Sequence, residues 1–321
     1  MSRIDAHHHI WRPAPAPPPS PSPSPARSPR SGPGPRRRVH AWLDAPEMAP
    51  VRRDFTLEDL APAALAAGID RTILVQVLPD ADETTEFLAL ASSAGTVAGV
   101  VGWADLTADG LPGTLDALRA SPGGDLLVGI RHLVQAERDP GWLTRPDVLR
   151  GLRTVAEAGL AYDLLVLPRQ LPAAVAAVRE LPELTFVLDH LAKPPIAAGE
   201  LRPWASSIRE LAALPNVFCK LSGMVTEADW HDWDVAALRP FADVALDAFG
   251  PERVMFGSDW PVCLLAASYE EVVGAAEALT AGLTGTERSQ VFGATAERAY
   301  RLGEVHRRGR PGEGRAAEGA R

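Results

Sequence analysis

The chain has 321 residues, of which 46% are hydrophobic and 23% charged, and its formal net charge is −9. This composition is typical of a globular protein, and the negative charge disfavours nucleic acid as a partner. No apolar run reaches the length of about 20 residues that a membrane-spanning helix needs, and the N-terminus lacks the layout of a secretion signal. The two cysteines, Cys219 and Cys263, cannot form a disulfide framework, so we expect a protein of the reducing cytoplasm.

Eight short, largely apolar runs recur along the chain and predict strands. They cover residues 3–10, 72–78, 97–103, 126–132, 160–166, 184–190, 216–222 and 253–259. Stretches with helical spacing lie between them, and four of these end in glycine, a common residue just after a helix. These four are residues 57–68, 84–95, 145–159 and 239–250.

Strands that alternate with helices indicate parallel β-α-β units. Eight such units predict an α/β fold of the closed (β/α)8 TIM-barrel type. An open, doubly wound sheet is the structural alternative. The first strand is not followed by the G-x-G-x-x-G turn of a dinucleotide-binding sheet, which disfavours that version of the alternative.

One segment interrupts this pattern directly after the first strand. Residues 13–38 consist only of Pro, Ala, Ser, Arg and Gly. Such a composition cannot bury apolar area, and its prolines cannot donate to a β ladder. We therefore expect one barrel domain over residues 1–302, interrupted by a disordered or polyproline-like surface loop at 13–38 and followed by a disordered tail at 303–321.

Most of the predicted strands become polar at their C-terminal ends, although a strand buried on both faces is expected to stay apolar. The polar residues are His7, His8, His9, Gln76, Arg131, His132, Asp163, Asp189, His190, Lys220, Ser222, Ser258 and Asp259. In a parallel barrel these ends meet at one mouth, where active sites lie. A ring of imidazoles, carboxylates and cations from different strands therefore predicts an active site.

The sequence IDAHHHIW places three histidines at the end of the first strand. Side chains at positions i and i+2 share a strand face, so His7 and His9 can both point into the barrel mouth while His8 points outwards. Two such imidazoles can bind a divalent cation or polarise a carbonyl group. The H-x-H pattern alone is a weak signal, and it gains weight from His190 and Asp259 at the ends of other strands.

Asp259 follows the last predicted strand, where a carboxylate can orient or deprotonate a water molecule. The alternative is a structural role as a helix N-cap or in an Asx turn. His190 is a candidate third imidazole of the site, with a structural histidine as the alternative.

Further residues are candidates for substrate binding, namely Arg131, His132, Gln76, Lys220, Trp260 and Trp11. The planar fork of Arg131 can hold a carboxylate or hydroxyl groups, or it can form a structural ion pair. Lys220 lies in an apolar strand, where a buried lysine needs a partner or a function. The two tryptophans are expected in the pocket wall, and core packing is the alternative.

Five segments carry a resemblance to a known family: IDAHHHIW, GIRHLVQAERDPGWL, DHLAKP, CKLSGMVTEA and VMFGSDWPV. In this order and spacing they resemble the amidohydrolase superfamily. The closer resemblance is to its amidohydrolase-2 branch, which includes L-fuconolactone, L-rhamnonolactone and 2-pyrone-4,6-dicarboxylate lactonases. It covers roughly residues 3–302, apart from the 13–38 insertion. It implies an amidohydrolase-type barrel with His7, His9, His190 and Asp259 as site residues.

The resemblance implies a hydrolase that opens a cyclic ester, either a sugar lactone or a small carboxylated lactone, by attack of water. Asp259 would take the proton of the water and pass it to the leaving alkoxide. His7, His9 and His190 would polarise the carbonyl, directly or, together with Asp259, through one divalent cation, with Zn²⁺ as the expected metal. Lactonases of this branch act both with and without a metal.

Two metals are not expected, because the fourth strand ends in Arg131-His132 and not in a bridging lysine or glutamate. A metal-dependent decarboxylase on the same scaffold is the first alternative function. A non-catalytic binding barrel is the second. We expect a small-molecule substrate and no membrane partner, and we leave a homo-oligomer open.

Overall fold

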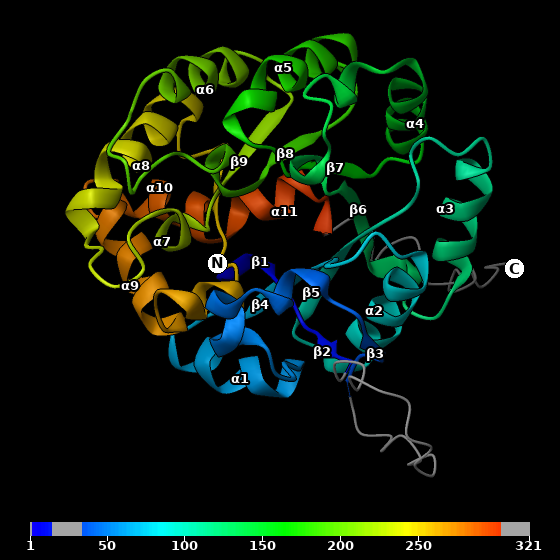
Figure 1. Ribbon diagram of the computed structural model, residues 1–321, viewed down its shortest axis with the longest axis horizontal. Helices are drawn as coiled ribbons and strands as arrows, with labels where there is room; N and C mark the ends of the chain where they lie inside the picture. Colours follow the sequence, from blue (N-terminus) through cyan, green and yellow to red (C-terminus); the bar gives the residue numbers. More distant parts are fainter. Residues whose placement is uncertain (1, 15–33, 303–321) are drawn as a thin grey trace, which may run out of the picture.

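The computed structural model describes residues 2–14 and 34–302. Eight parallel strands form one sheet that curls into the barrel of Figure 1, in the order β1-β4-β5-β6-β7-β8-β9-β10. They are β1 (Ile4–His8), β4 (Arg71–Val75), β5 (Val97–Gly102), β6 (Leu127–His132), β7 (Ala161–Leu164), β8 (Phe186–Leu188), β9 (Val217–Leu221) and β10 (Val254–Phe256). Each lies in one of the eight predicted runs, except that β4 begins one residue earlier. The (β/α)8 barrel expected from the sequence is confirmed.

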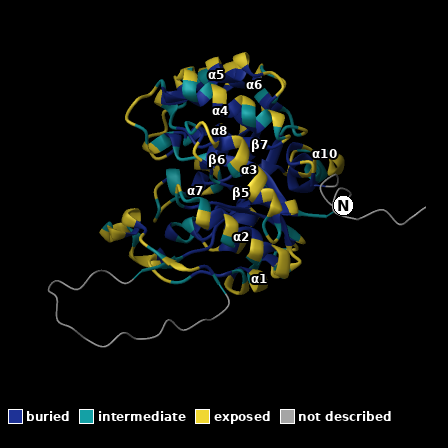
Figure 2. Ribbon diagram, turned by 90° about the vertical axis from the view of Figure 1, so that its right-hand side faces the viewer, coloured by how far each residue is buried: buried dark blue, intermediate teal, exposed yellow. Residues whose placement is uncertain are grey.

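Helices follow the strands and cover the outside of the barrel, with their exposed residues on the outer surface (Figures 1 and 2). They are α1 (Leu57–Ala66), α2 (Ala81–Ala94), α3 (Leu111–Ala120), α4 (Pro146–Glu157), α5 (Leu171–Glu180), α6 (Trp204–Ala212), α7 (Met224–Glu227), α8 (Val235–Phe249), α9 (Tyr269–Leu279), α10 (Gly285–Ser289) and α11 (Thr295–Ala299). The four glycine-terminated stretches correspond to α1, α2, α4 and α8. None of the helices in the described ranges is long and apolar enough to cross a membrane.

The first and last strands are joined by a short seam. The backbone N–H of Asp259 donates to the carbonyl of His7 at 2.8 Å. The buried Asp5 carboxylate of β1 accepts from the N–H of Ser258 at 2.8 Å and from its hydroxyl at 2.6 Å. The hydroxyl of Tyr269, on α9, donates to the same carboxylate at 3.1 Å. The seam therefore fixes the histidine-bearing end of β1 beside the segment that carries Asp259.

The ends of the predicted 13–38 loop are structured, which corrects the expected boundaries. Two-residue strands, β2 (Arg12–Pro13) and β3 (Arg37–Arg38), pair in parallel. The Arg38 guanidinium forms ion pairs with Asp80, at 3.0 Å, and with Glu86. Charged side chains thus hold the returning chain against α2, an outcome that the proline content does not reveal.

Two short 3-10 helices, η1 (Ala41–Asp44) and η2 (Pro46–Val51), follow this return of the chain. The middle of the predicted loop, at residues 15–33, and the predicted tail at 303–321 lie outside the described residues. Cys219 and Cys263 are buried and unpaired, in agreement with the expectation that they form no disulfide.

Glu83 fixes the turn that follows β4. Its carboxylate accepts hydrogen bonds from the N–H groups of Val77, at 2.8 Å, and Leu78, at 2.9 Å. The side chain is buried, and this burial raises the pKa of Glu83 to about 7 against the opposing effect of the two backbone hydrogen bonds and of Arg38. The folded protein therefore binds a proton at Glu83 between about pH 4.5 and 7, whereas the unfolded chain releases it.

We expect the Glu83→Gln variant to lose this pH dependence, because the amide keeps an acceptor oxygen but does not ionise. The free energy of unfolding of the wild type should fall relative to the variant as the pH rises from 4.5 to 7, by an amount on the order of 3 kcal/mol. Urea titrations of both proteins at several pH values measure the difference. Parallel stability curves for the two proteins would contradict the expectation.

Candidate active site

A bulge in β1 determines which histidines face the barrel mouth. The register of β1 against β4 shifts before His8, whose ring lies 3.0 Å from the hydroxyl of Thr72. Ala6 already packs with the apolar residues inside the barrel, so an unbroken alternation would have turned His8 inwards. The bulge places His7 and His9 on the inner side instead, and their Nε2 atoms lie 3.1 Å apart.

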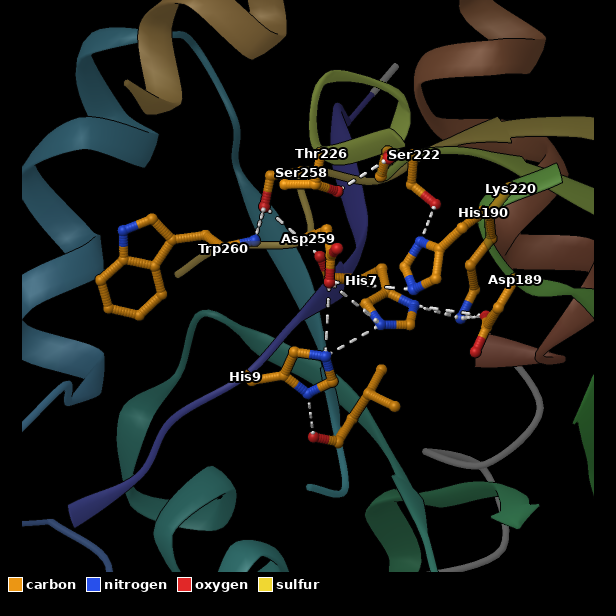
Figure 3. Close-up of polar contacts among 12 residues, drawn as sticks. His7, His9, Asp189, His190, Lys220, Ser222, Thr226, Ser258, Asp259 and Trp260 are labelled. Carbon is orange, nitrogen blue, oxygen red and sulfur yellow. Dashed lines mark hydrogen bonds and ion pairs between the residues drawn. The ribbon is translucent and has the colours of Figure 1, made fainter. Parts of the chain in front are cut away.

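The ends of β1, β8 and β10 bring three imidazoles around one carboxylate (Figure 3). The Nε2 atoms of His7, His9 and His190 lie 3.8, 3.5 and 3.8 Å from Oδ1 of Asp259, respectively. All four side chains are buried. Burial acts to raise the pKa of Asp259, but the three imidazoles together hold it below its ordinary value. Asp259 is therefore ionised at neutral pH.

Two of these residues adopt backbone conformations that are rare for side-chain-bearing residues. Asp259 has a φ of 56°, and residues 190–193 form a run of four consecutive positive φ values. Left-handed conformations cost about 1–2 kcal/mol per residue, and such strain gathers at functional sites. The run at 190–193 is held by the indole N–H of Trp204, which donates to the Leu191 carbonyl at 2.7 Å.

A second layer of hydrogen bonds orients the imidazoles. Nδ1–H of His9 donates to the Val75 carbonyl at 2.8 Å, and Nδ1 of His190 lies 2.8 Å from the Ser222 hydroxyl. Both residues therefore present Nε2 towards Asp259. Burial lowers the pKa of His190 to about 4, although the charge of Asp259 opposes this shift. His190 is thus a neutral imidazole at neutral pH.

These side chains fit a divalent cation. One ligand atom from each of His7, His190 and Asp259 lies within 4.8 Å of the other two. Imidazole nitrogens with one carboxylate are donors that zinc prefers, and a hydrogen-bonded outer nitrogen is typical of zinc-binding histidines. His9, which the sequence also predicts as a ligand, borders this group through its contacts with His7 and Asp259.

A cavity of about 450 Å³ opens above the cluster. His9, His190 and Asp259 line it, whereas His7 lies behind them and is fully buried. Of the predicted substrate-binding residues, Arg131 and Trp11 line this cavity. Of the predicted polar strand ends, His9, Arg131, His190 and Asp259 therefore meet at this cavity.

The other four predicted substrate-binding residues do not line the cavity, and each has a protein partner instead. His132 stacks on Trp142 with ring centroids 4.3 Å apart. Gln76 exchanges hydrogen bonds with Arg131. Trp260 packs edge-on against a phenylalanine, and Lys220 is enclosed inside the barrel. The sequence identifies polar or aromatic residues near a strand end but not the neighbours that engage them.

Several cavity residues were not predicted from the sequence. Trp42 comes from η1, and Trp230 lies beyond α7. Lys193 and Glu227 form an ion pair of 2.7 Å at the cavity wall. Lys193 lies in the DHLAKP segment close to His190, so the sequence could have indicated that its side chain lies near the site. Glu227 likewise lies in the CKLSGMVTEA segment, whereas nothing in the local sequence marks Trp42 and Trp230.

A model of the amidohydrolase family matches residues 4–302, the whole barrel. The chain belongs to the amidohydrolase family. It is 39% identical to an L-fucono-1,5-lactonase of Burkholderia multivorans over 94% of this chain and 97% of that protein. It is 36% identical to an L-fucono-1,5-lactonase of Burkholderia ambifaria over 94% and 96%. The structure of an amidohydrolase from Burkholderia multivorans with bound Zn has 38% identity and a TM-score of 0.82, covering 94% of this chain and 100% of that one.

The family match confirms the amidohydrolase resemblance carried by the five segments. It runs through residues on both sides of the 13–38 loop, while the division into one barrel domain and a tail stays a prediction. The bound Zn of the Burkholderia multivorans amidohydrolase is consistent with the fit of a cation to His7, His190 and Asp259.

Gly223 leaves the space that the ring of His190 occupies. A Cβ atom at this position would lie 2.7 Å from Nδ1 of His190. We expect Gly223→Ala to displace the imidazole and to weaken Zn²⁺ binding at least about tenfold, as losses in the surroundings of a metal ligand do. Calorimetric Zn²⁺ titration measures the affinity, and ring resonances in NMR spectra report the position of His190.

Gly95→Ala is the matched control for this variant. Gly95 has a φ of 67°, close to the 63° of Gly223, but nothing lies within 4 Å of its Cβ position. Both variants should therefore lose about 1–2 kcal/mol of stability from the backbone alone, and Gly95→Ala should bind Zn²⁺ as the wild type does. An undisturbed His190 ring in Gly223→Ala would refute the steric argument.

Proposed function

We propose that this amidohydrolase is a lactonase, which opens a cyclic ester by attack of water. The observation that carries the proposal is the convergence of His9, His190 and Asp259, backed by His7, at one wall of a 450 Å³ cavity. The lactonases of the two Burkholderia species, similar over nearly the whole chain, support it.

Asp259 is the proposed general base. Its ionised carboxylate accepts a proton from the water as the water oxygen attacks the carbonyl carbon of the lactone. The tetrahedral intermediate collapses with cleavage of the ring C–O bond. The alkoxide that leaves takes the proton from Asp259, and the product is the open hydroxy acid. Water and lactone are the reactants, and Asp259 returns to its ionised form.

The imidazoles are proposed to stabilise the negative charge on the carbonyl oxygen. His9 and His190 reach the cavity directly, and His7 supports His9 from behind. We propose that one divalent cation, Zn²⁺, is held here by His7, His9, His190 and Asp259, and that when bound it supplies Lewis-acid polarisation of the carbonyl. The residues alone provide orientation of the reactants and proton transfer.

The charges at the cavity wall favour an uncharged substrate. Arg131 forms a buried ion pair with Asp189 at 3.0 Å, which is the structural alternative left open by the sequence. Lys193 is paired with Glu227. Because both cations that line the cavity are already paired, neither is free to bind a substrate carboxylate without losing its partner. We therefore propose a hydroxylated, neutral lactone in place of a carboxylated one.

Indole rings complete the proposed substrate site. Trp11, Trp42 and Trp230 line the cavity and offer flat apolar surfaces. The indole N–H groups of Trp11 and Trp230 already donate to the carbonyls of Val51 and Thr226, so these two rings contribute their faces. Pockets of this kind bind a ring through its faces and select it through a few polar contacts. The decarboxylase alternative is less supported, because the relatives named above are lactonases. The binding-barrel alternative would leave the buried His/Asp cluster without use.

A lactone panel tests the function and the charge argument together. We expect hydrolysis of neutral sugar lactones, measured with a pH indicator, at a kcat/KM at least about tenfold above that for carboxylated lactones, since a substrate carboxylate would have to displace a paired one. Glu227→Gln should narrow this ratio, because it releases Lys193 to pair with a substrate carboxylate. Inactivity towards the whole panel, with or without Zn²⁺, would contradict the proposed function, and carbon dioxide release from aromatic acids would favour the decarboxylase.

Asp259→Asn should fold normally and lose at least about 10²-fold in kcat with little change in KM. The amide is nearly isosteric with the carboxylate but cannot accept a proton at neutral pH. His8→Ala is the control, since His8 faces away from the cavity, and it should keep most of the activity. If the Asp259→Asn enzyme retains more than about a tenth of the wild-type kcat, Asp259 has a structural role only.

A further inference from the structure

Lys220 lies inside the barrel, beneath the His/Asp cluster, and its side chain is fully buried. Its ammonium group lies 2.6 Å from Oδ2 of Asp163, 2.9 Å from Oδ1 of Asp189 and 3.0 Å from Nδ1 of His7. The hydroxyl of Tyr300 donates to the Asp163 carboxylate from the other side. Lys220 does not line the cavity above the cluster, so substrate binding there does not account for it.

The hydrogen bonds of His9 favour one position for the proton of His7. Nδ1 of His9 donates to the Val75 carbonyl, so a neutral His9 ring has only a lone pair at Nε2. The Nε2 atoms of His9 and His7 are 3.1 Å apart (Figure 3). His7 is then the donor, with its proton on Nε2. Its Nδ1 is an acceptor in that tautomer, and Lys220 donates to it.

Asp189 favours the opposite position for the proton of the His7 ring. Its Oδ1 lies 3.3 Å from Nδ1 of His7, and this buried oxygen has no hydrogen-bond partner among the described residues, although it lies at ion-pair distance from Lys220. If the proton of His7 moves to Nδ1, Asp189 gains a donor and Nε2 becomes a free lone pair. Arg131, whose Nη1 lies 3.3 Å from that Nε2, can donate to it only in this second tautomer. A cation likewise requires the free Nε2 lone pair.

We propose that Lys220 and Asp189 are opposing positioning residues that set the tautomer of His7. Lys220 favours the proton on Nε2, where His7 donates a hydrogen bond to His9. Asp189 favours the proton on Nδ1, which presents the Nε2 lone pair to a cation. The balance between them determines the affinity of the site for a metal ion. This inference rests on the His/Asp cluster of the proposed function but needs no assumption about the substrate.

Two variants separate the two effects. Lys220→Met combined with Asp163→Asn removes the donor while keeping the buried charge balanced. Asp189→Asn replaces the carboxylate acceptor by a weaker amide. We expect the double variant to bind Zn²⁺ about tenfold more tightly than wild type, and Asp189→Asn to bind it about 10–100-fold more weakly. Zn²⁺ itself is the probe, titrated by competition with a chromogenic chelator.

A charge-balanced control exists on the outer helices, away from the cavity. Arg153→Met combined with Glu180→Gln removes the ion pair between α4 and α5. It should change Zn²⁺ affinity by less than about threefold, well below the effect seen for groups that orient a ligand. ¹⁵N NMR of the imidazoles in chelator-treated protein gives the second readout. The His7 proton should lie on Nε2 in wild type and in Asp189→Asn, and on Nδ1 in the Lys220→Met double variant.

Opposite signs of the two affinity changes are the signature of tautomer control. A purely structural role would weaken Zn²⁺ binding in both variants and leave the tautomer unchanged, and that result would overturn the proposal. A wild-type spectrum with the proton on Nδ1 would also overturn it, and this measurement stands even if the double variant does not fold. None of these readouts depends on hydrolysis, so a negative lactone panel would leave this test intact.

Discussion

The seam between β1 and β10 is the constraint on which the site depends. It joins segments 253 residues apart in sequence through the buried carboxylate of Asp5, which accepts from the N–H and the hydroxyl of Ser258. Because the next residue is Asp259, any loss of this seam moves the carboxylate relative to His7. Burial raises the pKa of Asp5 to about 6, yet four hydrogen-bond donors act against that rise. The geometry of the candidate site is thus a consequence of barrel closure.

The fold was predictable because its signals are local and repeated. Each strand is a short apolar run, and the helices between strands show their periodicity and their terminal glycines. The prediction that His7 and His9 point inwards took His7 as the inward-facing residue and applied the alternation of strand side chains from there. Counting from Ala6 would have given the opposite face, and only the bulge reconciles the two. A bulge depends on the pairing of β1 with β4, which the sequence of β1 alone does not encode.

The division between substrate contacts and structural contacts was not predictable. Arg131 and Lys220 are both cations near strand ends, yet the first lines the cavity and the second is enclosed. Their partners, Asp189 directly after β8 and Asp163 in β7, come from other parts of the barrel, and pairing across a barrel leaves no local pattern. The expected cytoplasmic location and oligomeric state stay predictions.

The buried charged groups give the interior an uneven distribution of charge, which a packed apolar core would lack. Buried ion pairs contribute little net stability compared with apolar residues of the same volume, so their presence calls for another reason. Lys220 and Arg131 balance Asp163 and Asp189 below the cluster, which leaves the charge of Asp259 as the uncompensated one in this group at the cavity. The imidazoles surround that carboxylate. The interior therefore presents a single negative charge with nitrogen ligands to the substrate space, an arrangement suited both to a proton-accepting base and to a divalent cation.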